Sequence, residues 1–116
     1  MMYFDADGYT WAQARTLCES LPGDTVLAKI DDADEFALAQ PLFVGTPYDE
    51  VWFGANDFTT ARVWMWTDGT PVTYFSWKTG EPNNTNDNCL VFDLDRSGNY
   101  DDRTCSDRTS YLCSRY

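Results

Sequence analysis

Four cysteines constrain the fold of this 116-residue chain more than any other feature of its sequence. Cys18, Cys89, Cys105 and Cys113 are even in number and form no CxxC pair, and the chain has no histidine, so disulfides are favoured over a zinc site. Disulfides persist in oxidising compartments, and we therefore expect a secreted, extracellular protein. The cysteine positions alone leave open all three possible pairings.

The composition is typical of a folded domain with a strong negative charge. Hydrophobic residues make up 43% of the chain and aromatic residues 16%, and we expect a single globular domain over residues 1–116. Nineteen acidic residues against eight basic ones give a formal charge of -11, which excludes nucleic acid as a partner. No apolar run approaches the roughly 18 residues of a membrane span, so we expect no membrane insertion.

The first half of the chain carries two helix signals. Residues 10–13 form a capping box, in which Thr10 accepts from the backbone and Gln13 reaches back, and apolar residues then follow the spacing of one buried helix face up to the stop signal at 21–23. The capping signal is repeated at residues 32–35 and predicts a second helix over 32–40. Short strands are expected at 3–5 and 26–30.

The second half shows no helical period. Short apolar runs separated by turn residues predict strands at 51–53, 63–66, 90–92 and 111–113. Residues 78–88 hold Gly80, Pro82 and four asparagines without periodicity, which predicts a long loop. Loops of this length in a compact domain are usually functional or held by something other than packing.

Oxygen-bearing side chains are concentrated in this loop and shortly before Cys105. They are Glu81, Asn83, Asp87, Asp101 and Asp102. Sets of carboxylate and amide oxygens suit calcium, which accepts six to eight oxygens in irregular geometry. Any single aspartate of so acidic a chain is more often a solvated surface charge, so the spacing of the set decides the interpretation.

The spacing follows a set of motifs that covers nearly the whole chain. The motifs are Trp11 with Cys18, Val51-Trp52-Phe53-Gly54-Ala55, Trp64-x-Trp66-Thr67-Asp68-Gly69, Glu81-Pro82-Asn83, Asp87-Asn88-Cys89, and Tyr100-Asp101-Asp102 ahead of Cys105 and Cys113. Together they resemble a C-type lectin domain of the short, two-disulfide form. The resemblance implies an α+β fold with two helices, antiparallel strands and a long calcium-binding loop. It also implies that Cys18 pairs with Cys113 and Cys89 with Cys105.

The resemblance further implies one calcium ion that itself coordinates two hydroxyls of a sugar. Its ligands would be Glu81, Asn83, Asp87, Asp101 and Asp102. The expected sugar contacts are Glu81, Asn83, Thr85, Asp87 and Asp101, with Thr85 assigned because it lies in the same loop. The family also implies a cis peptide bond before Pro82, which X-Pro bonds permit at a cost of about 0.5 to 1 kcal/mol.

Two positions decide which sugar we expect. In the family, Glu81-Pro82-Asn83 goes with mannose-type sugars, and this motif makes them the first choice. Asp101 stands where the family usually has asparagine, so an amide donor is lost and galactose or N-acetylgalactosamine remains an alternative. A lectin-like domain that binds a protein or ice without sugar is a further alternative.

Other expectations complete the prediction. Asp57 and Asp87 are the only acids at the positions of the family's optional second calcium site, where Ala61, Asn84 and Asn88 are neutral, so we expect one tight calcium. Acids that share one cation are poor proton donors, so we expect no enzymatic activity.

Trp52, Trp64, Trp66 and Trp77 are expected in the core. Because a single shallow sugar site binds weakly, we expect a homodimer, noncovalent because all cysteines are used internally.

Overall fold

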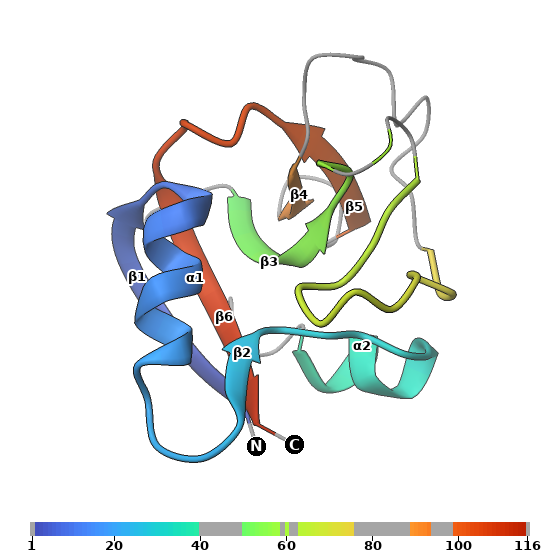
Figure 1. Cartoon of the computed structure of the whole chain (residues 1–116), viewed down its shortest axis with the longest axis horizontal. Helices are drawn as coiled ribbons and strands as arrows, with labels where there is room; N and C mark the ends of the chain where they lie inside the picture. Colours follow the sequence, from blue (N-terminus) through green and yellow to red (C-terminus); the bar gives the residue numbers. More distant parts are fainter. Residues whose placement is uncertain are drawn as a thin grey trace.

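The computed structural model describes residues 2–39, 50–58, 60, 63–75, 89–93 and 99–115, with the side chains of 2–7 and 99 excepted. Two helices and six strands are present in this part of the chain (Figure 1). They are β1 (Met2–Tyr9), α1 (Trp11–Glu19), β2 (Thr25–Leu27), α2 (Ala33–Ala39), β3 (Glu50–Asn56), β4 (Cys89–Asp93), β5 (Asn99–Arg103) and β6 (Thr109–Arg115). Neither helix is long and apolar enough to cross a membrane.

The described strands form one sheet in the order β1-β6-β3-β4-β5, and β2 also pairs with β6. Neighbouring strands are antiparallel except β3 and β6, which run parallel where Val51 faces Ser110 and Trp52 faces Tyr111. The sheet is therefore mixed, and the expected antiparallel arrangement holds for every described pairing but this one. The strand β6 follows β5 along the chain, yet it joins the first strands of the chain to β3, β4 and β5.

The two predicted helices are confirmed, including their first turns. The backbone N–H of Gln13 donates to Thr10 Oγ1 at 3.3 Å, and the backbone N–H of Thr10 donates to Gln13 Oε1 at 3.0 Å. The capping box of α1 is therefore complete. Before α2, the Glu35 N–H donates to Asp32 Oδ1 at 2.9 Å. The buried face of α1 carries Trp11, Ala14 and Cys18, as the spacing predicted.

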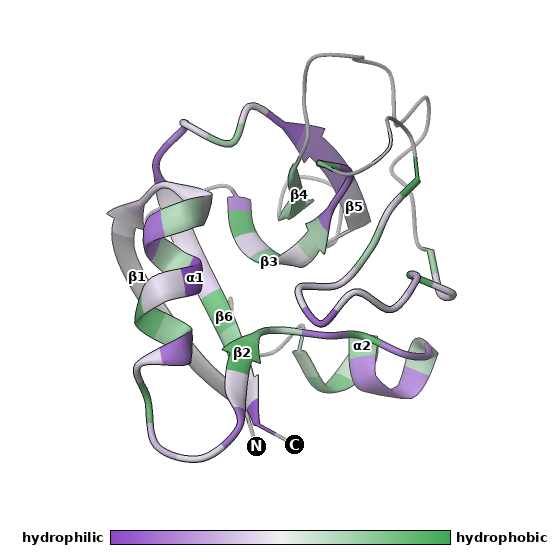
Figure 2. Ribbon diagram, in the orientation of Figure 1, coloured by the Kyte–Doolittle hydropathy of each residue, from purple (hydrophilic) through white to green (hydrophobic). Residues whose placement is uncertain are grey.

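Successive side chains of a strand point to opposite faces of the sheet, so the continuous apolar runs of β3 and β4 supply apolar side chains to both faces. One face packs Val51 and Phe53 of β3 with Leu90 and Phe92 of β4. The other face packs Trp52 with Val91 and with the helix α1. Figure 2 shows β4 in the hydrophobic colour and β5, its neighbour, in the hydrophilic colour. A polar strand thus lies beside the apolar strand β4.

Both disulfides implied by the resemblance are present. Cys18 of α1 is bonded to Cys113 of β6, and Cys89 at the start of β4 is bonded to Cys105 after β5. The sequence separations are 95 and 16 residues. By loop entropy such bridges stabilise by about 4.5 and 3 kcal/mol, and the longer one fastens the first helix to the last strand.

The prediction of a strand at 63–66 is wrong, because these residues form no strand in the structure. Met65 makes only isolated bridges, to Asn56 and Pro71. Trp64 and Trp66 are nevertheless buried, at 6% and 3% exposure, because they point into the same core as Phe53. Trp52 is also buried, so the core assignment of these three tryptophans is confirmed, while Trp77 lies outside the described residues.

Gly54 lies where β3 passes close to the backbone at the end of β2. Its N–H donates to the Ala28 carbonyl at 2.9 Å, and a Cβ at this position would lie 2.8 Å from the Leu27 carbonyl oxygen. We expect Gly54→Ala to lower the free energy of unfolding by about 1 to 3 kcal/mol, because backbone on both sides must shift. Urea unfolding measures this difference.

The control for this prediction is Gly69→Asn. Gly69 has a φ of 85° and no heavy atom within 4 Å of an added Cβ, and asparagine tolerates positive φ. We expect this change to cost less than about 1 kcal/mol. An equal loss in both variants would contradict a special packing role for Gly54.

Candidate functional site

Asp101 and Asp102 are the described members of the predicted calcium set, and both lie on β5. Each is fully buried, at 0% exposure. Asp102 pairs with Leu90 of β4 and Asp101 with Val91, so their side chains leave the strand on opposite faces of the sheet. The strand β5 ends the sheet in the described part of the chain.

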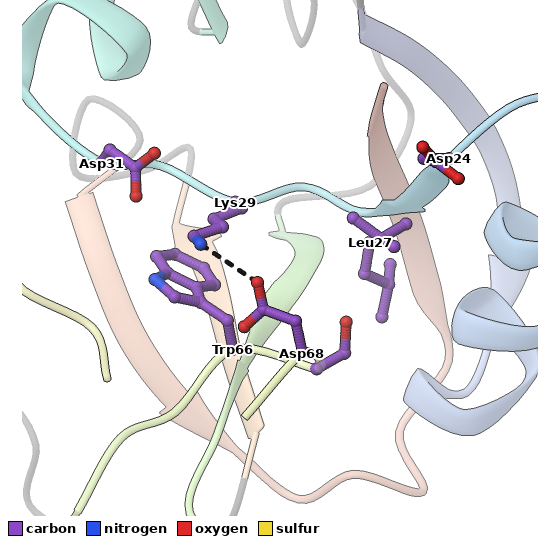
Figure 3. A pocket seen from close by; sticks show the side chains of 8 residues that line it. Asp24, Leu27, Lys29, Asp31, Trp66 and Asp68 are labelled. Carbon is purple, nitrogen blue, oxygen red and sulfur yellow. Dashed lines mark hydrogen bonds and ion pairs between the residues drawn. The ribbon is translucent and has the colours of Figure 1, made fainter. Parts of the chain in front are cut away.

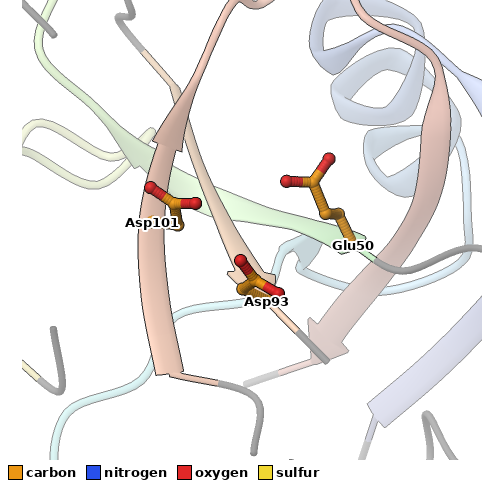
Figure 4. Close-up of side chains that lie close together, drawn as sticks. All are labelled: Glu50, Asp93 and Asp101. Carbon is orange, nitrogen blue, oxygen red and sulfur yellow. The ribbon is translucent and has the colours of Figure 1, made fainter. Parts of the chain in front are cut away.

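Asp101 lies in a cluster of charged side chains on the face shared with Trp52. Arg103, two residues on, places its Nη1 2.6 Å from Asp101 Oδ2. The same guanidinium contacts Glu50 of β3 through Nε and lies 3.8 Å from Asp93 of β4 through Nη2. Figure 4 shows the carboxylates of Glu50, Asp93 and Asp101 gathered from three neighbouring strands. We call these four residues the Arg103 cluster.

The carboxylate oxygens of this cluster are close enough for a metal ion. One oxygen from each of Glu50, Asp93 and Asp101 lies within 4.8 Å of the others. In the structure the positive charge among them is the guanidinium of Arg103, which also donates from Nη1 to the Asp102 carbonyl at 3.0 Å. The cluster is therefore organised by an arginine.

Burial and charge act against one another in the cluster. Burial raises the pKa of Glu50 above its ordinary value although Arg103 acts to lower it, and Asp93 and Asp101 add to the rise. Burial would lower the pKa of Arg103, but the Glu50 and Asp101 carboxylates outweigh burial and raise it. Arg103 therefore stays charged at any pH at which the domain is folded.

Asp102 lies on the other face of β5, together with Tyr100. Tyr100 is fully buried and packs edge-on against Phe92 with ring centroids 5.8 Å apart. Burial raises the pKa of the Tyr100 hydroxyl, so the phenol stays neutral beside Asp102. Tyr100 is thus accommodated within the aromatic core.

Glu81, Asn83, Thr85 and Asp87 lie outside the described residues, as does the bond before Pro82. The end of their segment is described: Cys89 pairs with Arg103 in the β4–β5 ladder, and its disulfide joins it to Cys105. In sequence Asp87 precedes this anchored residue by two positions. The donors on β5 are hard oxygens, which fits calcium, and the complete ligand set remains a prediction.

Sequence reasoning did not identify Glu50, Asp93 and Arg103. The i, i+2 spacing of Asp101 and Arg103 indicates that the two side chains lie on one face if the segment is a strand. It was missed because residues 99–103 are too polar for a strand prediction, and β5 forms by pairing with β4.

A second feature is a cavity of about 320 Å³ between the chain around β2 and the turn at 66–68 (Figure 3). Lys29 Nζ lies 3.1 Å from Asp68 Oδ2 across it, and Trp66 and Leu27 form part of its wall. Two hydrogen bonds from Thr70, and to a lesser degree Lys29, lower the pKa of Asp68 to about 2. These contacts explain the turn geometry and identify no ligand.

The chain matches the family described as Lectin C-type domain over residues 7–115. With the mixed sheet, the two helices and both disulfides in place, the chain belongs to the C-type lectin domain family. The family generally binds carbohydrates and Ca²⁺ and is not enzymatic. The chain is therefore a lectin-type binding domain.

Similar sequences include the C-type lectin lectoxin-Enh7 of Pseudoferania polylepis. It is 36% identical over 115 residues, which cover 92% of this chain and 71% of that protein. The human C-type mannose receptor 2 is 31% identical over 107 residues, which cover 91% of this chain. The chain spans 7% of that receptor's length.

Solved structures share the fold. Human lithostathine has a TM-score of 0.87 and 29% identity, with 97% of this chain and 80% of that chain covered. The cow carbohydrate-recognition domain of CD23, solved in the presence of a GlcNAc2Man3 oligosaccharide, has a TM-score of 0.82 and 28% identity, with 97% and 84% covered. A calcium-independent type II antifreeze protein has a TM-score of 0.84 and 28% identity, with 97% and 82% covered.

The low pKa of Asp68 predicts a pH effect on stability. A carboxylate whose pKa falls on folding stabilises above its ordinary pKa of 3.8 and loses that stabilisation as the pH falls toward about 2. We expect Asp68→Asn to lower the free energy of unfolding at pH 7 by less than about 1 kcal/mol, because the side chain is half exposed. We also expect the difference from wild type to vanish near pH 2 in urea unfolding.

Asp107→Asn is the matched control, because it removes one exposed carboxylate that lies outside both helices. It should leave stability unchanged at both pH values. A pH-independent loss in Asp68→Asn would contradict the prediction.

Proposed function

We propose that this chain is a calcium-dependent lectin whose single calcium coordinates a sugar diol directly. The calcium ligands would be Glu81, Asn83, Asp87, Asp101 and Asp102. Glu81, Asn83, Asp87 and Asp101, with Thr85 beside them, would contact the sugar. A vicinal pair of hydroxyls can replace two waters on calcium, while carboxylates accept the hydroxyl protons.

The observation that carries the proposal is the burial of two adjacent carboxylates on β5. Buried carboxylates are costly unless they are paired, hydrogen-bonded or bound to a metal. Asp101 shares the single guanidinium of Arg103 with Glu50 and Asp93, so the cluster keeps an excess of negative charge that a cation would offset. The β4–β5 ladder aligns Asp102 with Leu90, one residue after the disulfide-anchored Cys89. Asp87 precedes Cys89 by two positions, and Cys89 pairs with Arg103, the neighbour of Asp102 on β5.

The proposed sugar is of the mannose type. Its support is the Glu81-Pro82-Asn83 motif, together with the oligosaccharide in whose presence the related cow CD23 domain was solved. Asp101 weighs toward galactose or N-acetylgalactosamine, because a carboxylate offers no donor to a hydroxyl lone pair.

A binding domain without sugar is the rival proposal. The related antifreeze protein is described as calcium-independent, so this fold also serves without the ion. The complete set of oxygen ligands in the present sequence favours calcium and sugar.

We further propose that residues 1–116 act as one recognition domain, secreted and paired in a noncovalent homodimer. Support for secretion comes from the two disulfides and the absence of free cysteines among the described residues. Support for a dimer is the weak binding expected of one shallow sugar site, around millimolar, which a second site in the same assembly would offset.

Calcium should stabilise the domain strongly. A ligand at 100 times its dissociation constant stabilises by about 2.7 kcal/mol, so millimolar calcium should raise the Tm by roughly 10 °C. The rise should disappear with EDTA, and below about pH 5 as the carboxylates are protonated. Differential scanning fluorimetry measures it, and magnesium at equal ionic strength is the control. An identical Tm with calcium and EDTA would refute the calcium site.

Sugar binding should depend on the same carboxylates. We expect Asp87→Asn with Asp102→Asn to abolish calcium-dependent retention on a glycan array, while EDTA abolishes retention of the wild type. Asp34→Asn with Asp107→Asn removes two exposed acids and should retain binding. Circular dichroism checks that both variants fold. Retention of the double site variant on the array would show that the sugar binds elsewhere.

A further inference from the structure

Asp101 adds a negative charge at a position where the family usually has a neutral amide. The carboxylate is fully buried, and a buried charge requires a partner. Arg103 supplies that partner, with 2.6 Å between Nη1 and Oδ2. The two residues lie on one face of β5, so the backbone itself sets their separation.

Arg103 is held in place by neighbouring strands as well. Its Nε contacts Glu50 on β3, its Nη2 faces Asp93 on β4, and its Nη1 also donates to the Asp102 carbonyl. A guanidinium presents its donors in one rigid plane. These contacts hold the guanidinium plane of Arg103 in place, and its ion pair with Asp101 therefore orients the Asp101 carboxylate before any metal binds.

We propose that Arg103 is a positioning residue that acts as the resident cation of the Glu50, Asp93 and Asp101 carboxylates, and that it weakens calcium binding by competing for Asp101. This inference rests on the proposed function, in which Asp101 is a calcium ligand. It adds a residue that tunes the site without contacting the sugar.

The competition follows from charge. The guanidinium is permanently positive, so a divalent ion on Asp101 is repelled by Arg103 while it is attracted by the carboxylates. Without Arg103 the cluster would keep three carboxylates within 4.8 Å of one another and lose its positive charge. Three carboxylates without Arg103 attract calcium more strongly, and without the ion their mutual repulsion lowers the stability of the folded domain.

Calorimetric titration with calcium chloride tests the inference. We expect Arg103→Gln to bind calcium at least tenfold more tightly than the wild type, or to gain a second binding equivalent, and to melt at a lower temperature in EDTA. A residue with a merely structural role would weaken calcium binding when replaced, so the direction of the change separates the two roles.

Arg103→Lys is the matched control because it keeps the charge and loses the planar fork. Its calcium affinity should remain within threefold of the wild type, with a small loss of Tm in EDTA. Arg103→Gln combined with Asp101→Asn removes both charges of the pair and guards against a variant that fails to fold. In this double variant the gain in affinity, relative to Asp101→Asn alone, should be less than threefold.

The outcomes separate this inference from the proposed function. If the wild type takes up no calcium, the proposed function fails, and a gain of calcium binding in Arg103→Gln still supports the resident cation. If the wild type binds calcium and Arg103→Gln binds with equal or lower affinity, the inference is overturned while the proposed function stands. An equal gain with and without Asp101→Asn would also overturn the competition for Asp101.

Discussion

The fold depends on a sheet that is buried on both faces. Alternation along β3 and β4 sends Val51, Phe53 and Phe92 to one core and Trp52 and Val91 to the other. Neither core would be closed without β6, which pairs with β1, β2 and β3 at once. The disulfide from Cys18 to Cys113 fixes this strand to α1, so the geometry of β3, β4 and β5 is set by contacts far along the chain. A precise binding site can be built on strands that are held in this way.

Much of this architecture could be predicted from the sequence. The capping box at Thr10 and Gln13 and the capping signal at Asp32 are local, and both helices begin where these residues place them. The apolar runs at 51–53, 90–92 and 111–113 form strands because their burial is strong enough to decide local structure. The pairing of the cysteines came from the family resemblance, since four positions alone permit every combination.

The rest could not be predicted because it depends on tertiary contacts. The polar segment Asn99–Arg103 becomes a strand only beside β4. The apolar run at 63–66 makes only the isolated bridges of Met65 in the described residues, although its tryptophans are buried. For the candidate site, the donor types and their order were readable from the residues themselves. The contacts of Arg103 with Glu50 and Asp93 were not, because they join three strands that are distant in sequence.

The complete burial of β5 has a consequence for association. In the described part of the chain this strand forms the margin of the sheet, yet Tyr100, Asp101 and Asp102 are 0% exposed. A covered margin offers no backbone N–H and C=O groups to a strand of another molecule. Extension of the sheet from one molecule to the next is therefore opposed at these residues.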